Sequence, residues 1–218
     1  MLARMSSSSQ PSFRRLPRAV RQQQMLDAAV TVFSRRGFHA ASMDEVAEEA
    51  GISKPMVYAY LGTKEELFLA CLHREATRLM EAIVAVVDDR DLPPDQRLWR
   101  GLRAFFRFVG GHRDAWAVLY RQARSSEPFA RETAGMRARM AEVIAGMLAG
   151  AVAADERQAR GADLEAAAYA LVGAGESLAD WLADHPQEDP DRTAGRMMDI
   201  AWLGAAELLR GGVWRSPD

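Results

Sequence analysis

The amino-acid sequence predicts an all-α protein of about nine helices, divided into a small N-terminal helical domain and a larger C-terminal one. Three observations support this fold class. Apolar residues recur three and four positions apart in almost every segment, which is the spacing of one helix face. Several segments open with helix-start signals such as Ser-x-x-Glu and Asp-Pro. No segment shows the strict apolar–polar alternation of a half-buried strand.

The composition is that of a globular chain without disulfides. The 218 residues are 49% hydrophobic and 27% charged, and a single cysteine, Cys71, cannot form an internal disulfide. No apolar run approaches the length of a membrane span, and the first residues lack the apolar centre of a signal peptide. We therefore expect a cytoplasmic protein without a membrane partner.

Charge is distributed unevenly along the chain. Residues 1–64 carry nine basic and five acidic side chains, a net charge of +4, whereas the other 19 basic and 25 acidic side chains give residues 65–218 a net charge of −6. A basic front suggests a polyanionic partner, although chance asymmetry explains the charges equally well. Residues 1–17 are expected to form a disordered basic arm. Arg14 and Arg15 of this arm, together with Arg18 just after it, either contact DNA or remain solvated.

The first predicted helix spans residues 18–36. Gly37 follows two arginines of the last turn, where cations suit the helix dipole, and is predicted to end the helix. The apolar side chains fall at positions i, i+3, i+4 and i+7 and so form one stripe: Leu26, Ala29, Val30 and Phe33.

Two short helices follow. Ser42 and Glu45 have the spacing of a capping box, which starts a short helix that Gly51 stops. Ser53 is predicted to cap the next helix, whose first turn holds Pro55. Two short helices joined by a tight glycine turn form a helix-turn-helix.

Six further helices are expected in the rest of the chain. Thr63 and Glu66 form a second capping box that opens a long helix, and Asp189 with Pro190 opens the last one. The expected helices cover residues 63–88, 98–109, 116–125, 129–148, 163–183 and 190–210.

The third helix can present a free face to a partner. Small and apolar residues stand where it must touch the second helix, namely Val46, Ala47, Ala50, Ile52, Val57 and Tyr60. A helix of about nine residues is roughly 13 Å long, close to the width of the DNA major groove, which admits one helix by its N-terminal part. The residues left for the free face include Lys54, Pro55, Met56, Tyr58 and Ala59.

Several landmarks between Ala28 and Phe68 carry a family resemblance. They are the Phe33…Gly37-Phe38 end of the first helix, Ser42, the Val46-Ala47…Ala50-Gly51-Ile52-Ser53 turn, Tyr58-x-Tyr60 and Lys64-Glu65-x-Leu67. Together they resemble the DNA-binding domain of TetR-family transcriptional regulators. The resemblance implies a helix-turn-helix DNA-binding domain over residues 18–64 and a ligand-binding and dimerisation domain over residues 65–218.

Carried over by position, the resemblance implies contacts with a double-stranded DNA operator. Ser42, Tyr60 and Lys64 would contact phosphates. The residues that would face the groove are Lys54, Pro55, Met56 and Tyr58. The sequence departs from the family pattern at Pro55, where glycine is frequent, and at Ala59 and Leu61. Tyr60 is as readily a core aromatic, and the two lysines could be solvated charges. The predicted DNA-binding residues are Ser42, Ser53, Lys54, Pro55, Met56, Tyr58, Ala59, Tyr60 and Lys64.

The resemblance also implies a homodimer. The helix over residues 163–183 has a wide apolar face with small residues at its centre, and the last helix adds a second face. Two helices from each subunit would form a four-helix interface about a two-fold axis, as the reading of a palindrome requires. The alternative is a core within one chain. The predicted interface residues are Leu164, Leu171, Gly175, Leu178, Leu182, Trp202, Ala205 and Leu209.

A cavity for an unknown small-molecule effector is expected among the helices between residues 67 and 183. If Glu176 faces it, the carboxylate favours a cationic or hydrogen-bond-donating ligand, whereas Asp180 is expected to face solvent. Close packing is the alternative for each candidate. The candidate lining residues are Phe105, Phe106, Trp116, Tyr120, Met136, Met140, Tyr169 and Glu176.

The sequence carries no enzyme signature. There is no HExxH, phosphate-binding loop or serine elbow, the four histidines lack metal-ligand spacing, and Cys71 is expected to be an inert core thiol. We therefore expect no catalysis and no cofactor or metal. The prediction is a ligand-responsive transcriptional repressor that binds a palindromic operator as a homodimer. The alternative is an all-helical carrier or interaction module without specific DNA binding.

Overall fold

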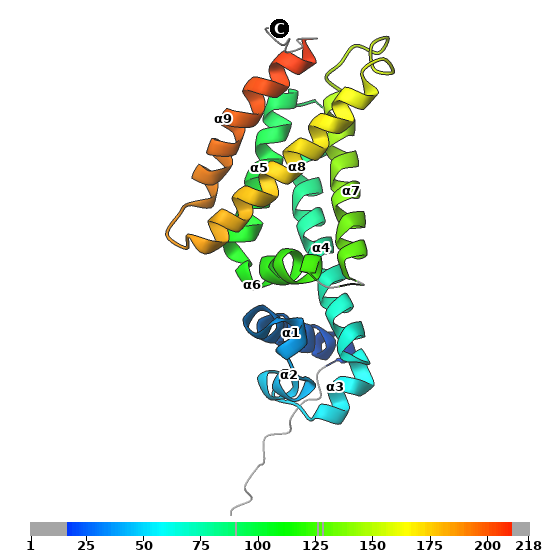
Figure 1. Ribbon diagram of the computed structural model, residues 1–218, viewed down its shortest axis with the longest axis vertical. Coiled ribbons are helices and arrows are strands. Elements are labelled where there is room, and N and C mark those ends of the chain that lie inside the picture. Colours follow the sequence, from blue (N-terminus) through cyan, green and yellow to red (C-terminus); the bar gives the residue numbers. More distant parts are fainter. Residues whose placement is uncertain (1–16, 90, 126, 128, 211–218) are drawn as a thin grey trace, which may run out of the picture.

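The structure, a computed structural model, describes residues 17–89, 91–125, 127 and 129–210, except for the side chains of residues 119, 125 and 203–209. Over these ranges the chain forms nine α-helices with a π-helical and a 3₁₀ segment and no strand, so the all-α prediction is confirmed (Figure 1). All of the predicted arm except Pro17 lies outside the described residues. No described helix is long and apolar enough to cross a membrane.

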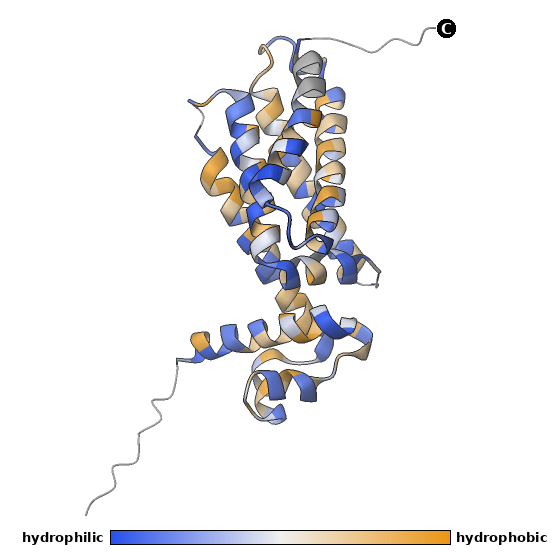
Figure 2. Cartoon of the chain, turned by 90° about the vertical axis from the view of Figure 1, so that its left-hand side faces the viewer, coloured by the Kyte–Doolittle hydropathy of each residue, from blue (hydrophilic) through white to orange (hydrophobic). Residues whose placement is uncertain are grey.

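Three helices form a head at one end of the molecule (Figure 1): α1 (Arg18–Ala40), α2 (Met43–Glu49) and α3 (Lys54–Leu61). In Figure 2 hydrophobic and hydrophilic stretches alternate along the helices, as one buried face per helix requires. The predicted stripe of the first helix is buried, and the head core includes Leu26, Phe33, Val46, Ala47 and Val57.

Gly37 interrupts α1 where the sequence predicts its end. Its φ of 80° and ψ of 159° are non-helical, and glycine tolerates this backbone because it has no Cβ. The chain then makes a further short helical turn to Ala40. The backbone N–H of Phe38 donates to Oε1 of Gln122 over 2.8 Å. A side chain from the C-terminal part of the chain therefore contacts the head directly at this break.

Of the three caps predicted at the starts of α2, α3 and the long helix that follows them, two are confirmed. The Ser42 and Thr63 hydroxyls accept from the backbone N–H groups of Glu45 and Glu66, whose carboxylates accept in return. The bond from the Ser42 backbone N–H is the main reason that the pKa of Glu45 is lowered. Ser53 occupies the N-cap position of α3 but makes no side-chain cap bond, so this prediction is wrong.

One helix, α4 (Lys64–Val87), runs out of the head and forms part of a second group of helices, the body (Figure 1). Its first turns place Leu67 and Phe68 in the head core, and Ile83 is buried near its other end. Leu79 lies between these positions and packs against the core clusters of both parts.

The rest of the body consists of α5 (Pro94–Gly111), α7 (Phe129–Ala149), α8 (Gly161–Asp184) and α9 (Pro190–Leu209). In Figure 1, α5 and α9 lie side by side, and α8 crosses the other helices obliquely. The buried positions of α8 form one stripe at spacings of three and four residues from Leu164 to Leu182.

Ion pairs connect α9 to α5. Asp191 in the first turn of α9 accepts hydrogen bonds from Arg103 and Arg107 of α5 at 2.9 and 2.7 Å. The bond from Arg107, and then that from Arg103, holds the pKa of Asp191 well below its usual range. Asp189 accepts from the backbone N–H of Arg192 at 2.8 Å, which confirms the predicted cap.

The segment between α5 and α7 is more irregular than the single short helix that the sequence predicts. It begins as α6 (Arg113–Trp116), continues as a π-helix over Ala117–Gln122, here called the π-helical segment, and ends as a 3₁₀ turn over Ala123–Ser125. Both α6 and the π-helical segment contact α1. Isolated π-turns occur frequently at functional sites.

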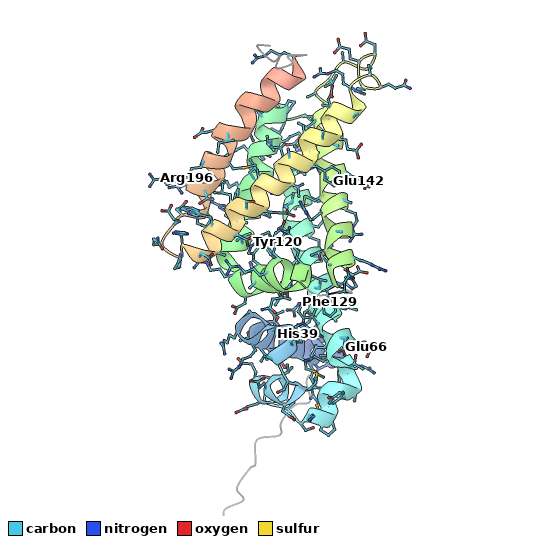
Figure 3. All side chains as sticks on the ribbon, viewed as in Figure 1. His39, Glu66, Tyr120, Phe129, Glu142 and Arg196 are labelled. Carbon is cyan, nitrogen blue, oxygen red and sulfur yellow. The ribbon has the colours of Figure 1, made fainter. Side chains whose placement is uncertain are left out.

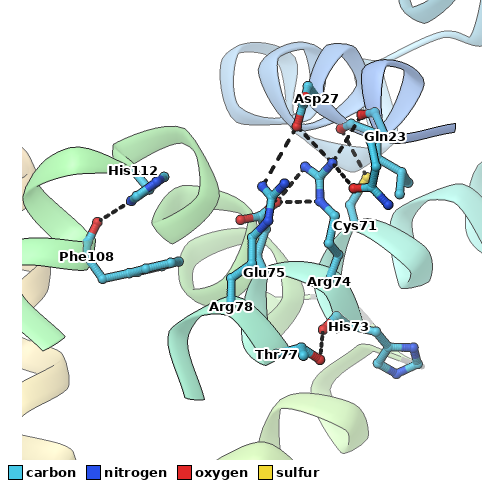
Figure 4. Close-up of polar contacts among 11 residues, drawn as sticks. Gln23, Asp27, Cys71, His73, Arg74, Glu75, Thr77, Arg78, Phe108 and His112 are labelled. Atoms are coloured by element: carbon cyan, nitrogen blue, oxygen red, sulfur yellow. Dashed lines mark hydrogen bonds and ion pairs between the residues drawn. The ribbon is translucent and has the colours of Figure 1, made fainter. Parts of the chain in front are cut away.

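An ion-pair cluster around the buried Glu75, here called the junction cluster, connects α1 to α4 (Figure 4): Asp27, Arg74, Glu75 and Arg78. Glu75 is 1% exposed, and its Oε1 accepts from Arg74 and Arg78 at 2.7 and 3.1 Å. Arg74 also pairs with Asp27 over 2.8 Å. The sequence offers one signal for a buried acid, because Glu75 falls on the apolar stripe of α4, four residues from Cys71 and from Leu79.

We expect Glu75→Gln to lower the free energy of unfolding by roughly 3 kcal/mol, because it leaves the nearly buried Arg74 without its nearest carboxylate. Urea unfolding measures the change. Glu81→Gln, at an exposed position of the same helix, is the control and should change the free energy of unfolding by no more than about 0.5 kcal/mol. Equal destabilisation by both variants would contradict a structural role for the cluster.

Candidate nucleic-acid interface and effector cavity

The third helix, α3, lies at the far end of the head and exposes one face (Figure 1). Val57 and Leu61 are buried against the head, whereas Tyr58 is 45% exposed, which is a high value for a large aromatic side chain. A short helix with a free N-terminal half has the shape that a major groove admits. The exposed residues are Ser53, Lys54, Pro55, Tyr58 and Ala59.

Met56 and Tyr60 are half-buried, since both also pack on the head core. Arg21 of α1 donates to the Met56 sulfur at 3.6 Å, and the Arg18 guanidinium lies 5.2 Å from the centre of the Tyr60 ring. Arg21 is therefore a candidate for DNA contact that was absent from the prediction. The sequence feature that could have identified Arg21 is its position three residues after Arg18, which places the two arginines on the same face of the helix.

Lys54 forms an exposed ion pair across the helix-turn-helix. Its Nζ donates to Oδ2 of Asp44 at 2.8 Å, and this hydrogen bond raises the pKa of Lys54. Exposed ion pairs contribute little to stability, so a phosphate can replace the aspartate at small cost. The Lys54 ammonium is therefore able to form an ion pair with a phosphate of the DNA backbone.

The side chain of Lys64 forms hydrogen bonds with the backbone of the head instead of extending into solvent. Its Nζ donates to the carbonyl oxygens of His39 and Ala41 at 3.2 and 3.1 Å and lies 4.8 Å from the centre of the Phe38 ring. The alternative of a solvated charge is therefore wrong for Lys64. An ammonium has three donors, so two backbone bonds leave capacity for a phosphate. The Ser42 hydroxyl is likewise engaged, in its capping box.

A cavity of about 470 Å³ lies in the body among α4, α5, α7 and α8, next to the π-helical segment. Its lining runs from His73 to Val87 on α4 and from Thr133 to Met147 on α7. Each of these spans is roughly 20 Å of helix, so the cavity is long as well as apolar. Six of the eight predicted residues line it: Phe105, Trp116, Tyr120, Met136, Met140 and Glu176.

Phe106 and Tyr169 do not line the cavity, and these two predictions are wrong. Phe106 is fully buried in the cluster that α5 forms with α9, because it is turned by about 100° from Phe105 on the same helix. Tyr169 is 45% exposed. It shares a stripe with Glu176 in sequence, but this stripe runs along the edge of the buried face of α8, where Glu176 is covered and Tyr169 is not.

Glu176 brings a buried carboxyl group to the cavity. Burial raises its pKa to about 8, and the nearby Asp180 carboxylate acts in the same direction. Nε of Arg137 lies 2.9 Å from Oε1 of Glu176, so the two side chains form an ion pair when Glu176 is ionised.

Two polar side chains beside Glu176 differ in how well the sequence predicts them. Asp180, expected to face solvent, has a 39% exposed side chain, which agrees with that expectation, and it also accepts from the indole Nε1 of Trp116 at 3.0 Å. Arg137 was not named, and a single sequence gives no signal for it, because its role depends on which residue of α8 packs opposite. On α4, the residues that line the cavity include Met80 and Ile83.

Cys71 is buried in the head core, as predicted. Burial raises the pKa of its thiol to about 12, so the reactive thiolate is absent at neutral pH. Across the described part of the chain, no group of histidine, cysteine, aspartate and glutamate side chains could hold a metal ion.

Three of the predicted dimer contacts face the interior of their own subunit: Leu164, Gly175 and Leu182 are buried. For these three the alternative of an intrachain core is correct. Leu171, Leu178 and Trp202 are half-buried, and the side chains of Ala205 and Leu209 lie outside the described residues. The outer face of α8 carries small residues instead: Ala162, Ala166, Ala170 and Ala174 are exposed.

Two protein-family models match the chain. The model described as bacterial regulatory proteins, tetR family, matches residues 25–71, which contain the helix-turn-helix and the start of α4. The model described as tetracyclin repressor-like, C-terminal domain, matches residues 94–204, which include α5 to most of α9.

Relatives resemble the chain over nearly its whole length. It is 31% identical over 204 residues to the HTH-type transcriptional activator FasR of Mycolicibacterium smegmatis, covering 89% of this chain and 87% of that protein. The crystal structure of a TetR-like transcriptional regulator from Rhodococcus sp. RHA1 is 47% identical, with a TM-score of 0.76, and covers 88% of this chain and 99% of that one. The fold is shared with FadR of Bacillus subtilis in complex with stearoyl-CoA (17% identity, TM-score 0.70, 82% and 96% covered).

The raised pKa of Glu176 predicts a pH dependence of stability. An unfolded glutamate has a pKa near 4.3, so between about pH 4.3 and 8 the folded state holds a proton that the unfolded state has lost. This group's contribution to the free energy of unfolding therefore falls as pH rises through that window. Thermal unfolding of Glu176→Gln should lack this contribution, whereas the exposed Glu142→Gln should retain it. Parallel pH profiles for the two variants would contradict the raised pKa.

Proposed function

Because the chain belongs to the TetR family and is a DNA-binding transcriptional regulator with a helix-turn-helix, we propose that it binds a palindromic operator as a ligand-responsive homodimer. Family membership also confirms the prediction of a regulator rather than an enzyme, and the carrier alternative no longer stands. The observation that supports the DNA contact most directly is the exposed face of α3 at the tip of the head.

Each part of the proposed interface has its own role. Pro55, Tyr58 and Ala59 face the major groove, with Met56 at the edge of this surface. Lys54, Tyr60 and Lys64 contact phosphates, and Arg18 and Arg21 on the adjacent α1 add positive charge beside them. Ser42 and Ser53 remain predicted contacts at the N-terminal ends of α2 and α3.

Two considerations support the proposed homodimer: the symmetry of the proposed operator and the outer surface of the body. A palindrome is read by two heads related by a two-fold axis. Exposed alanines on α8 allow close approach of a second helix, and Ile200 on α9 is 73% exposed, which is unusual for a large apolar side chain in a monomer. We propose that this outer face of α8 and α9, and not the buried stripe predicted from sequence, pairs the subunits.

Ligand response is proposed because the cavity is lined by the two elements that connect the body to the head, α4 and the π-helical segment. Met80 and Ile83 line it from α4, which continues into the head core, and Tyr120 lines it two residues before Gln122, which bonds to Phe38. An effector changes operator affinity by the difference in its affinity for the two arrangements of the heads. Repression stays a prediction, and the 31% identical relative is named an activator.

Selection of bound duplexes from a random pool tests the DNA contacts. We expect a palindromic site for the wild type. Lys64→Ala should weaken binding to all sequences and reduce the salt slope by about one, because a phosphate contact is lost. Met56→Ala should change the preferred base and leave the salt slope unchanged.

Arg131→Ala, an exposed cation on α7 far from α3, is the control for Lys64→Ala and should bind DNA as the wild type does. Since Lys64 also bonds to two backbone carbonyls, its variant is compared at a temperature where unfolding shows that it is fully folded. Equal effects of Lys64→Ala and Met56→Ala on every sequence would contradict this division of roles.

Ile200→Glu should dissociate the proposed dimer, because it places a charge at the centre of an apolar interface. Sedimentation equilibrium measures the change, and operator affinity should fall together with dimer content. Val84→Glu is the matched control, since Val84 is a 40% exposed apolar residue on α4, away from α8 and α9. A dimer that survives Ile200→Glu would place the interface elsewhere.

A further inference from the structure

The effector cavity reaches the molecular surface on one side of the body. Among the described residues that line it, the exposed ones all belong to α4 or α7: His73, Thr77, Glu81, Arg139 and Val143. The lining residues of α5, α6, α8 and the π-helical segment are buried or half-buried. Because a cavity opens where its lining residues meet solvent, this one opens between α4 and α7.

The exposed lining residues form two stripes. On α4 they recur every four residues from His73 to Glu81, and on α7 Arg139 and Val143 are also four apart, so each set lies along one side of its helix. Figure 1 shows α4 and α7 as neighbours, yet α4 packs chiefly on α5 and α7 chiefly on α8. The boundary between α4 and α7, here called the α4–α7 seam, is therefore the most sparsely packed wall of the cavity.

The contacts that join the two helices lie at the end of the seam nearest the head. Phe68 packs on Phe129 with ring centroids 4.4 Å apart. Beside them, Oε2 of Glu132 accepts a hydrogen bond from Nε2 of His73 at 3.1 Å, and this is the one side-chain hydrogen bond between the described residues of α4 and α7. The two side chains are 54% and 47% exposed, so the pair contributes little to stability and can break without loss of the fold.

The other walls of the cavity are closed by buried side chains. Trp116 and Tyr120 stack with ring centroids 4.4 Å apart beside the π-helical segment, and Val172, Gly175 and Glu176 are buried on α8. A ligand that entered through these walls would have to displace close-packed side chains, which costs more than parting a half-exposed pair.

We propose that effectors enter and leave the cavity through the α4–α7 seam, and that the His73–Glu132 pair is a latch across this entrance. The inference rests on the proposed ligand response and adds the route by which a ligand reaches the cavity. Opening the seam moves α4 relative to α7, and both helices contribute to the head core, through Phe68 and Phe129. The motion that admits a ligand therefore acts on the helix that carries the head.

Stopped-flow fluorescence with Nile red, a neutral dye that brightens in apolar surroundings, tests the latch in the full chain. His73→Ala and Glu132→Ala should each raise both the association and the dissociation rate constant about threefold, because an exposed pair of this kind is broken only while the entrance is open. The dissociation constant should stay unchanged. The double variant should be no faster than either single variant, since both substitutions remove the same contact.

Two bulky substitutions test the entrance itself. Val143→Trp narrows the seam from α7 and Thr77→Trp narrows it from α4, and each should slow Nile red association by roughly tenfold or more. Both positions are exposed, so the fold should tolerate the larger side chain. Glu142→Trp is the matched control, because Glu142 is exposed on α7 but does not line the cavity, and it should bind the dye as the wild type does.

Association as fast in Val143→Trp and Thr77→Trp as in Glu142→Trp would overturn the proposed entrance. Latch variants that match the wild type, or effects of His73→Ala and Glu132→Ala that add in the double variant, would overturn the latch. The dye would still bind in these cases, so the proposed ligand response would stand. A protein that binds duplex DNA but no Nile red would overturn the inference and leave the DNA-binding function intact.

Discussion

The hydrophobic core cluster of the head extends into the body, where it includes Phe108, Val118 and Phe129, and the rest of the structure depends on this contact. The Phe68 ring lies 5.2 Å from Phe38 of the head and 4.4 Å from Phe129 at the start of α7 (Figure 3 labels Phe129). Leu79 packs on the clusters of both parts. Because protein interiors are close-packed, a displacement of α7 or of the π-helical segment has no void to absorb it and must move α1 or α4. The body is therefore placed to influence the orientation of α3.

The elements of the head were predictable because their signals are local. The capping boxes at Ser42 and Thr63 each span four residues, and Gly37 breaks α1 by its own backbone conformation. The exposure of Tyr58 also followed from the pattern, since the residues around it are needed for contact between helices. Six of the eight cavity residues were found for a similar reason, because large side chains of an apolar stripe must face some interior.

The remaining features depend on contacts between residues far apart in sequence. The buried carboxylate of Glu75 is neutralised by arginines that also pair with Asp27 on another helix. The amine of Lys64 donates to backbone carbonyls of residues more than twenty positions away in the sequence. The outward position of Tyr169 results from its place at the edge of the buried face of α8, where a periodic pattern does not decide burial. The π-helical segment has no pattern of its own: Trp116 and Tyr120 stack face to face across it, at an interplanar angle of 10°, and Gln122 ends it against Phe38.

The two lysines have a consequence for the chemistry of the protein. Lys54 and Lys64 are the only lysines among the 218 residues, so apart from the α-amino group every primary amine lies in or beside the head. Lys54 projects into solvent, whereas the Lys64 amine is held by two carbonyls over an aromatic ring. Acylation in the cell, or an amine-reactive dye in the laboratory, would therefore modify Lys54 first. A single such adduct would remove a positive charge from the tip of α3 and leave the body untouched.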